Sequence, residues 1–163
     1  MKNFLRELLP YIIAVVVVLL IKTYLWAPIK VNGASMYPTL HHKDIMILNK
    51  INYKLNKIKR FDIVVIKYND EYIIKRVIGL PGETVSCKDG KIYINKQVIK
   101  ENFTHEDTPD FPEVKVGKDE YFVLGDNRPN SHDSRFVGPF HVDKILGHAT
   151  YTLLPFSRWG RKK

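Results

Sequence analysis

The sequence predicts a mainly β protein with one apolar helix at its N-terminus. Short runs rich in Ile, Val and Tyr recur along the chain, and clusters of Gly, Pro, Asn and Asp separate them. After residue 30, no long stretch has the 3.6-residue period of an amphipathic helix. The third observation is the apolar N-terminal run itself, which differs in composition from everything that follows.

Six runs have the composition of strands. They are Asp44 to Ile51, Asp62 to Tyr68, Glu71 to Gly79, Lys91 to Ile99, Tyr121 to Leu124 and Ile145 to Leu153. The dipeptide Asn69-Asp70 predicts a hairpin turn, and Asn95-Lys96 is a candidate for a second one. Residues 100–119 hold two prolines and most of the local acid, so we expect a solvated excursion there. The basic tail, residues 158–163, is expected to be a frayed end close to a membrane.

Residues 8–26 predict a transmembrane anchor. The run has 19 residues and a single charge, Lys22. As a helix it would be about 28 Å long, close to the ~30 Å of a bilayer core. A cleaved signal peptide and a buried helix of a soluble protein remain open as alternatives.

The charges around this run predict its orientation. Lys2 and Arg6 precede it, so residues 1–7 are expected in the cytoplasm. Residues 27–163 would then form one extracytoplasmic domain on a single-pass protein of the cytoplasmic membrane.

Composition limits the partners. The formal net charge is +9, which favours an anionic partner, and the lysines are scattered without a nucleic-acid motif. We therefore expect an anionic phospholipid membrane and no nucleic acid. Cys87 is the only cysteine, so no internal disulfide can form, and the chain lacks metal-binding motifs, so neither a metal nor another cofactor is expected.

Ser35 is the first candidate for chemistry. It lies between small residues and a proline turn, in Gly33 to Pro38, shortly after the apolar run. This combination suggests a nucleophile that works at a bilayer surface, but a serine is weak unless a base takes its proton. The six histidines (41, 42, 105, 132, 141 and 148) have no distinctive setting, and a Ser-His-Asp arrangement stays an alternative.

Lys75 is a candidate for that base. Strand alternation places Ile73, Lys75 and Val77 on one face and turns Arg76 to the other. If the first face is buried, desolvation lowers the pKa of the amine and makes it a competent base near neutral pH. The alternative is a lysine that extends off a sheet edge into solvent.

A third candidate segment, Gly125 to Arg135, follows an apolar strand and is dense with short polar side chains. Asp133 with Arg135 or Arg128 could form charge-assisted hydrogen bonds. Ser131 could orient a nearby lysine amine. An ordinary polar turn is the alternative.

Five boxes, in this order behind the apolar run, resemble those of the type I signal peptidases. They are Ser35 to Leu40, Asp44 to Lys50, Arg60 to Val65, Lys75 to Glu83 and Gly125 to Arg135. The resemblance extends from the N-terminal run to about Gly147, and the short chain looks like the compact form of Gram-positive bacteria. It implies a twisted all-β fold with an exposed apolar surface that dips into the bilayer. It also implies a monomeric membrane-anchored serine endopeptidase that removes signal peptides from preproteins, cutting after small residues at −1 and −3.

The resemblance also implies roles for single residues. Ser35 takes the position of the nucleophile and Lys75 that of the general base. Ser131 matches a residue that hydrogen-bonds the lysine, Asp133 and Arg135 match a structural ion pair, and Asp126 and Asn127 lie in the same supporting box.

Two positions depart from the family pattern. Gly33 stands where some members have a hydroxyl residue for the oxyanion hole, so that hole would depend on backbone N–H groups such as that of Ser35. Lys43 precedes Asp44 where many members have glycine. Two other classes remain in view: an inactive membrane-bound paralogue, which would lack the serine or the lysine, and a self-cleaving repressor-type peptidase, which would need a DNA-binding domain.

Overall fold

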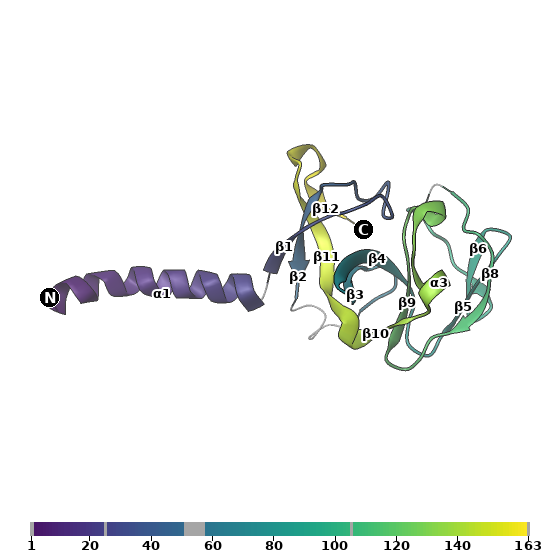
Figure 1. The fold of residues 1–163 in the computed structure, drawn as a ribbon, viewed down its shortest axis with the longest axis horizontal. Coiled ribbons are helices and arrows are strands. Elements are labelled where there is room, and N and C mark those ends of the chain that lie inside the picture. Colours follow the sequence, from purple (N-terminus) through teal and green to yellow (C-terminus); the bar gives the residue numbers. More distant parts are fainter. Residues whose placement is uncertain (1, 25, 51–57, 105, 163) are drawn as a thin grey trace.

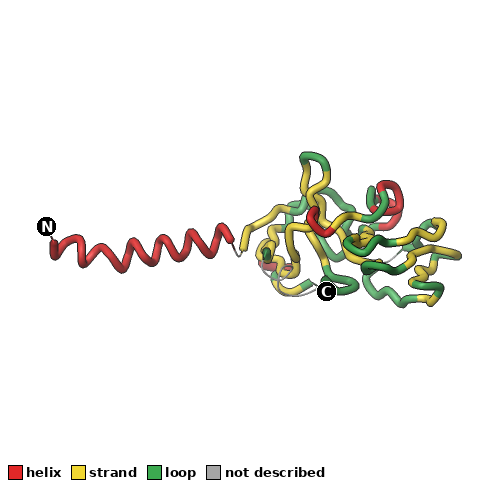
Figure 2. Tube along the Cα trace, turned by 90° about the horizontal axis from the view of Figure 1, so that it is seen from below, coloured by secondary structure: helices red, strands yellow, loops and turns green. Residues whose placement is uncertain are grey.

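An N-terminal helix extends away from a β domain that is built from two sheets (Figure 1). The structure is a computed structural model, and it describes residues 2–24, 26–50, 58–104 and 106–162. The helix and the smaller sheet lie at opposite ends of the molecule in two perpendicular views (Figures 1 and 2). The predicted mainly β class is confirmed.

All strand pairs among the described residues are antiparallel. The larger sheet consists of β1 (Trp26–Lys30), β2 (Ile45–Asn49), β3 (Ile63–Tyr68), β4 (Glu71–Gly79), β9 (Glu120–Leu124), β10 (Phe140–His141), β11 (Ile145–Leu154) and β12 (Gly160–Arg161). Its order is β1-β2-β11-β3-β4-β9-β10, and β12 pairs with β11. The smaller sheet consists of β5 (Thr84–Lys88), β6 (Lys91–Ile94), β7 (Gln97–Val98) and β8 (Phe111–Lys115), in the order β7-β6-β5-β8.

Helices are few and mostly short. They are α1 (Lys2–Tyr24), η1 (Arg128–Asn130), α3 (Ser134–Val137), η2 (Val142–Lys144) and η3 (Phe156–Arg158).

The predicted hairpins are both present. Asn69-Asp70 connects β3 to β4, with Tyr68 opposite Glu71. Asn95 and Lys96 connect β6 to β7 with φ of 50° and 68°, the pair of left-handed residues that a type I′ hairpin requires. Of the predicted strands, Glu71 to Gly79 is matched end to end by β4; the end of Asp44 to Ile51 lies outside the described residues.

The interpretation of residues 100–119 as a solvated excursion is wrong from Thr108 onward. Phe111–Lys115 forms β8, and Val116 and Thr108 are buried. Pro112 is tolerated because β8 is the edge strand of the smaller sheet, where one side of the backbone needs no partner.

Residues 158–162 of the C-terminal tail are also ordered, against the prediction of a frayed end. Arg158 forms an ion pair with the buried Asp44, and Gly160–Arg161 pairs with β11. A buried carboxylate requires a cation nearby, which explains why this tail folds back onto the domain.

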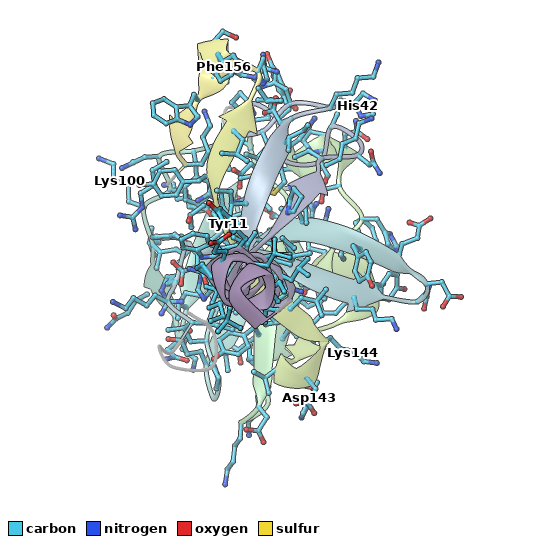
Figure 3. All side chains as sticks on the ribbon, turned by 90° about the vertical axis from the view of Figure 1, so that its left-hand side faces the viewer. Tyr11, His42, Lys100, Asp143, Lys144 and Phe156 are labelled. Atoms are coloured by element: carbon cyan, nitrogen blue, oxygen red, sulfur yellow. The ribbon has the colours of Figure 1, made fainter. Side chains whose placement is uncertain are left out.

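The N-terminal run forms a helix, but its boundaries differ from the predicted segment 8–26. Helix α1 begins at Lys2 and ends at Tyr24, while Trp26 already pairs with Asn49 in the β1–β2 ladder. Judged by length and apolar content, no helix within the described residues qualifies to cross a membrane. Tyr11 and its apolar neighbours on α1 are exposed, and Figure 3 shows the helix end-on in front of the β domain.

Three apolar clusters form the core. The first holds Val31, Met36 and Leu40 together with β2 and β3; the second lies between β3, β4, β9 and β11; the third joins the smaller sheet to β9. The loop that carries Ser35 is thus fixed by its own buried neighbours, Met36 and Leu40.

Candidate active site

Ser35 lies on the loop between β1 and β2. Met36 on its C-terminal side is 2% exposed and Leu40 is fully buried, so these two side chains hold the loop against the first core cluster. Tyr37 N–H donates to the Ala34 carbonyl at 3.0 Å, and Leu40 N–H donates to the Met36 carbonyl at 2.8 Å. The loop therefore presents Ser35 from a fixed turn, with its side chain at the wall of a groove.

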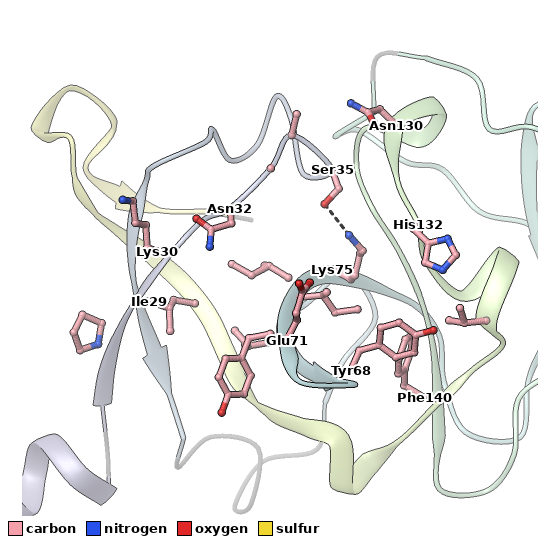
Figure 4. Close-up of a pocket in the computed structure, with 18 residues that line it drawn as sticks. Ile29, Lys30, Asn32, Ser35, Tyr68, Glu71, Lys75, Asn130, His132 and Phe140 are labelled. Atoms are coloured by element: carbon pink, nitrogen blue, oxygen red, sulfur yellow. Dashed lines mark hydrogen bonds between the residues drawn. The ribbon is translucent and has the colours of Figure 1, made fainter.

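Lys75 reaches the same point from β4. Its Nζ lies 2.7 Å from Ser35 Oγ, drawn as a dashed line in Figure 4. Within the described part of the chain, the side-chain hydrogen bond to Ser35 Oγ comes from this lysine and not from a histidine. Lys75 is 4% exposed, as expected if the strand face that it shares with Ile73 and Val77 is buried, and this face brings its amine to the serine.

Burial sets the charge of this lysine. It lowers the pKa of the Lys75 ammonium from 10.5 to about 8. The carboxylates of Asp133 and Asp126 raise that pKa, but burial outweighs them, and the positive charge of Arg135 lowers the pKa further. The neutral amine, the form that can accept a proton, is therefore about a tenth of the total at pH 7 and about half at pH 8.

Asp133 and Arg135 form the predicted ion pair. Arg135 Nε donates to Asp133 Oδ1 at 2.8 Å, and Arg135 Nη2 donates to Oδ2 at 2.9 Å. Burial alone would raise the pKa of Asp133, but hydrogen bonds from Arg135 and from the Gly125 N–H outweigh it and hold that pKa below its usual value. The pair fixes the carboxylate that also caps α3 through the Arg135 N–H.

Ser131 is buried next to the site, but its predicted bond is not seen. Among the described residues, no hydrogen bond joins Ser131 Oγ to Lys75. Ser131 packs instead against Gly125: a Cβ at position 125 would lie 2.2 Å from Ser131 Oγ and 2.4 Å from the Ser35 carbonyl oxygen. Gly125 therefore lies so close to Ser131 and to the Ser35 backbone that any side chain at position 125 would clash with them.

Asp126 has a partner that we did not predict. Arg76 Nε and Nη2 donate to its two carboxylate oxygens at 2.8 and 2.6 Å, and both side chains are fully buried. Thr39 Oγ1 also donates to Asp126, at 2.5 Å. Strand alternation turns Arg76 away from Lys75 and into the protein, and a buried guanidinium requires a carboxylate partner. This was the signal from which a buried ion pair of Arg76 could have been predicted.

Asn127 holds the peptide of the serine itself. Its N–H donates to the Ser35 carbonyl at 3.0 Å, and its Nδ2 donates to the Ala34 carbonyl at 3.1 Å. Gly33 has a φ of 92°, and its N–H donates to His42 Nδ1 at 3.1 Å. These bonds fix the backbone before Ser35, where Gly33 offers no side chain.

A groove of about 940 Å³ contains both Ser35 and Lys75. Ile29 and Asn32 line it on the β1 side, and Tyr68 and His132 line it beyond Lys75 (Figure 4). Among the described residues, no group of three or more His, Cys, Asp or Glu side chains is arranged to hold a metal.

Two strand edges border this groove. β4 pairs with β9 only over Arg76–Gly79, so its half from Glu71 to Lys75 has β3 on one side and the groove on the other. β1 is the outermost strand of its sheet and pairs with β2 alone. An extended chain laid between these edges would pass Ser35.

Comparison with known proteins assigns the family. Residues 4–154 match the family described as signal peptidase, peptidase S26. The chain is 39% identical to signal peptidase I S of Bacillus subtilis over 96% of this chain and 92% of that one, and 40% identical to signal peptidase I of Leptolyngbya laminosa over 91% and 78%. A crystal structure of a signal peptidase I from Enterococcus faecalis superimposes with a TM-score of 0.54 at 36% identity, covering 58% of this chain and 98% of that one. The chain therefore belongs to the signal peptidase family, peptidase S26, and is a serine endopeptidase of the signal peptidase I type.

Proposed function

We propose that this enzyme removes N-terminal signal peptides from preproteins through a Ser35–Lys75 dyad. The observation that carries the proposal is the 2.7 Å approach of Lys75 Nζ to Ser35 Oγ, made by an amine whose pKa is lowered to about 8 by burial. A base with that pKa suits a reaction near neutral pH.

In the proposed reaction, Lys75 accepts and returns a proton in each of two steps. Neutral Lys75 takes the proton of the Ser35 hydroxyl while Oγ attacks the scissile carbonyl carbon. The Lys75 ammonium then gives its proton to the leaving nitrogen, the C–N bond breaks, and the signal peptide remains as an ester on Ser35. Lys75 next takes a proton from water, the hydroxide attacks the ester, and the proton returns to Ser35 Oγ. The oxyanion formed in each half would be held by backbone N–H groups, that of Ser35 among them, since Gly33 has no side chain to contribute.

The groove supports a substrate in β conformation. Main-chain bonds to the free edges of β1 and β4 would hold the signal peptide across Ser35. Its side chains would then point alternately to opposite faces, so that those at −1 and −3 share one face. The face beside Ile29, Ile74 and Val65 is backed by the first core cluster, and this favours small residues at both positions.

We also propose that α1 attaches the enzyme to an anionic membrane, with the β domain on the extracytoplasmic side and the protein working as a monomer. Helix α1 exposes a large apolar surface, of the kind that marks a membrane or protein contact. Its apolar side chains are 53 to 71% exposed at Leu9, Tyr11, Val15 and Val18. Sharing an interface with the preprotein would raise the effective concentration of the two. Cell fractionation tests the attachment: we expect the full chain in the membrane fraction after an alkaline wash, and release of most of the protein would oppose it.

A cleavage assay tests the dyad. Purified wild type, Ser35→Ala and Lys75→Ala would be given the same preprotein, with Ala at −1 and −3. We expect each variant to lose more than about 1,000-fold in kcat/KM, because nucleophile and base act as a unit. Appreciable cleavage by either variant would refute the dyad, and full activity after replacement of His132, which lines the groove, would argue against a histidine base.

A further inference from the structure

Two buried arginines tie the segment between β7 and β8 to the back of the serine loop. Neither belongs to the dyad, and the two approach the site from different directions. One is Arg128 on η1; the other is Arg76 on β4. Arg128 contacts Glu101 and Thr108 and also bonds to Gly125, while Arg76 contacts Phe103 and also bonds to Asp126.

Arg128 forms the first connection. Its guanidinium is fully buried and binds both oxygens of Glu101, with Nη1–Oε2 and Nη2–Oε1 distances of 2.9 and 2.5 Å. Arg128 Nη1 also donates to Thr108 Oγ1. At the other end of the same group, Nε donates to the Gly125 carbonyl at 3.0 Å.

Arg76 forms the second connection. The ring of Phe103 lies over its guanidinium, with 4.0 Å between the guanidinium carbon and the ring centroid. The same guanidinium holds Asp126, and Asp126 in turn holds Thr39 on the serine loop. Phe103 also packs edge to face on Phe61, whose carbonyl accepts from Arg76 Nη1.

The two connections converge on consecutive residues, Gly125 and Asp126. Gly125 packs against the Ser35 carbonyl, and the next residues bond to Thr39 and, through Asn127 N–H, to Ser35. Without its carboxylate partner, the buried Arg128 would be forced to reorient, and it would carry the Gly125 carbonyl with it. A displacement of about 1 Å at a reacting group can cost about 100-fold in rate.

We propose that Glu101, Phe103 and Thr108 are positioning residues for Ser35, acting through Arg128 and Arg76. The proposal rests on the proposed dyad. It assigns a role in catalysis to a segment that the sequence describes only as acidic and solvated.

Steady-state kinetics on the full chain tests it, with the peptide substrate used for the dyad. Glu101→Gln keeps the size of the side chain but loses the paired charge. We expect kcat to fall about tenfold or more, KM to change by less than about twofold, and the pH midpoint of kcat to stay near 8, because Glu101 is not among the charges that act on Lys75. Phe103→Leu and Thr108→Val each remove one contact with little change in volume and should lower kcat in the same direction.

A second salt bridge supplies the matched control. Arg60 binds Glu83 through both of its oxygens and also donates to the Ile78 carbonyl, so it resembles the Glu101–Arg128 pair. It joins the end of β4 to the turn before β5, however, and its bonds do not lead to Gly125 or the serine loop. Glu83→Gln should lower the melting temperature as Glu101→Gln does, yet leave kcat within about twofold. The proposal is overturned if Glu101→Gln keeps the wild-type kcat, or if Glu83→Gln loses as much.

The remaining outcomes are separable. If Glu101→Gln does not fold, Phe103→Leu and Thr108→Val decide, and wild-type kcat in both overturns the proposal. Cleavage by Ser35→Ala would instead refute the dyad itself, whatever the variants at Glu101, Phe103 and Thr108 do.

Discussion

At the scale of single residues, the burial of Lys75 lowers the stability of the folded protein but favours the proposed reaction. An ammonium at this buried position loses hydration that Asp133 and Asp126 only partly replace, which is why its pKa falls to about 8. The difference from the ordinary 10.5 corresponds to roughly 3 kcal/mol of unfavourable free energy for the charged form. The same cost produces the neutral amine that the proposed reaction needs.

The first prediction is that Lys75→Met is inactive but more stable than wild type at pH 7, by up to about 3 kcal/mol. The folded pKa lies below the unfolded one, so the unfolded chain binds more protons between pH 8 and 10.5. Wild-type stability should therefore gain from Lys75 as pH rises through this window, and the variant should lack that gain. Urea unfolding at pH 7 and pH 10 measures both. Lys67→Met, on an exposed position of β3, is the control; a less stable Lys75→Met would contradict the assignment.

The second prediction concerns the pH dependence of activity. Because the base must be neutral, kcat/KM should rise with pH and level off above a midpoint near 8. The Asp133 carboxylate raises the pKa of Lys75, so Asp133→Asn should move the midpoint to lower pH, along with a loss of stability from the unpaired Arg135. Measuring kcat/KM against pH for the wild type and for Asp133→Asn, with the same peptide substrate, tests this prediction. A midpoint that stays in place in a folded Asp133→Asn would show that another group controls the rate.

Local signals made Ser35 and Lys75 candidates, a serine in a turn of small residues and a lysine on one face of a strand, and the family resemblance paired them. Asp126 and Arg76 could not be paired in the same way. They lie 50 positions apart, and only the β4–β9 register brings them together. The Ser131–Lys75 bond, carried over from the family, is the one predicted contact that the described residues do not show.

At the scale of elements, the turn before β2 contains a strained residue. Lys43 has a φ of 72°, a left-handed conformation that glycine adopts without cost, and its N–H donates to the Val31 carbonyl. The position where the sequence departs from the Gly-Asp pattern of its family thus keeps the backbone shape of a glycine.

The third prediction is that Lys43→Gly stabilises the domain by about 0.5–1 kcal/mol, since relief of strain exceeds the added freedom of the unfolded chain. Lys43→Ala keeps the strain and should give no such gain. Thermal melts of the three proteins distinguish these cases, and equal gains for Gly and Ala would mean that the side chain, not the backbone, was responsible.

Strand β4 was predicted to its ends because its run of Tyr, Ile and Val is bounded by the Asn69-Asp70 turn and by Gly79. Strand β8 was not, because Pro112 and Glu113 make Phe111–Lys115 look like a loop, and only its place at the edge of the smaller sheet makes a strand possible. Short strands such as β10 and β12 have two residues each and no period to detect.

At the scale of the whole molecule, an ion pair joins the C-terminal residues to the loop between β1 and β2. Arg158 Nε and Nη2 both donate to Asp44 Oδ1, at 3.0 and 2.6 Å, across 114 positions of sequence. Asp44 Oδ2 accepts from the His41 N–H at 3.0 Å, so one carboxylate joins the C-terminal hairpin, formed by β11, η3 and β12, to the loop that carries Ser35. Phe156, at the far end of that hairpin, is largely exposed (Figure 3).

The fourth prediction is that Arg158→Ala lowers the free energy of unfolding by about 1 kcal/mol, a modest value because a third of the arginine side chain is open to water. Burial alone would raise the pKa of Asp44, but Arg158 and the His41 N–H outweigh it and lower it. The contribution should therefore be present above the ordinary pKa of Asp and vanish as pH falls through the lowered one. Urea titrations between pH 7 and pH 3 follow it, with Arg161→Ala as the exposed control; a deficit that persists in acid would show that packing, not charge, is lost.

The half-paired strand β4 has a consequence for selectivity. If a substrate pairs with this edge, as we propose, its main-chain amides and carbonyls make the hydrogen bonds and its side chains make none of them. One enzyme would then accept many unrelated sequences, provided that the residues next to the cleaved bond are small. An open strand edge normally invites unwanted partners. Here the free edge of β4 lines the groove that contains Ser35, so the strand that would pair with it is the substrate itself.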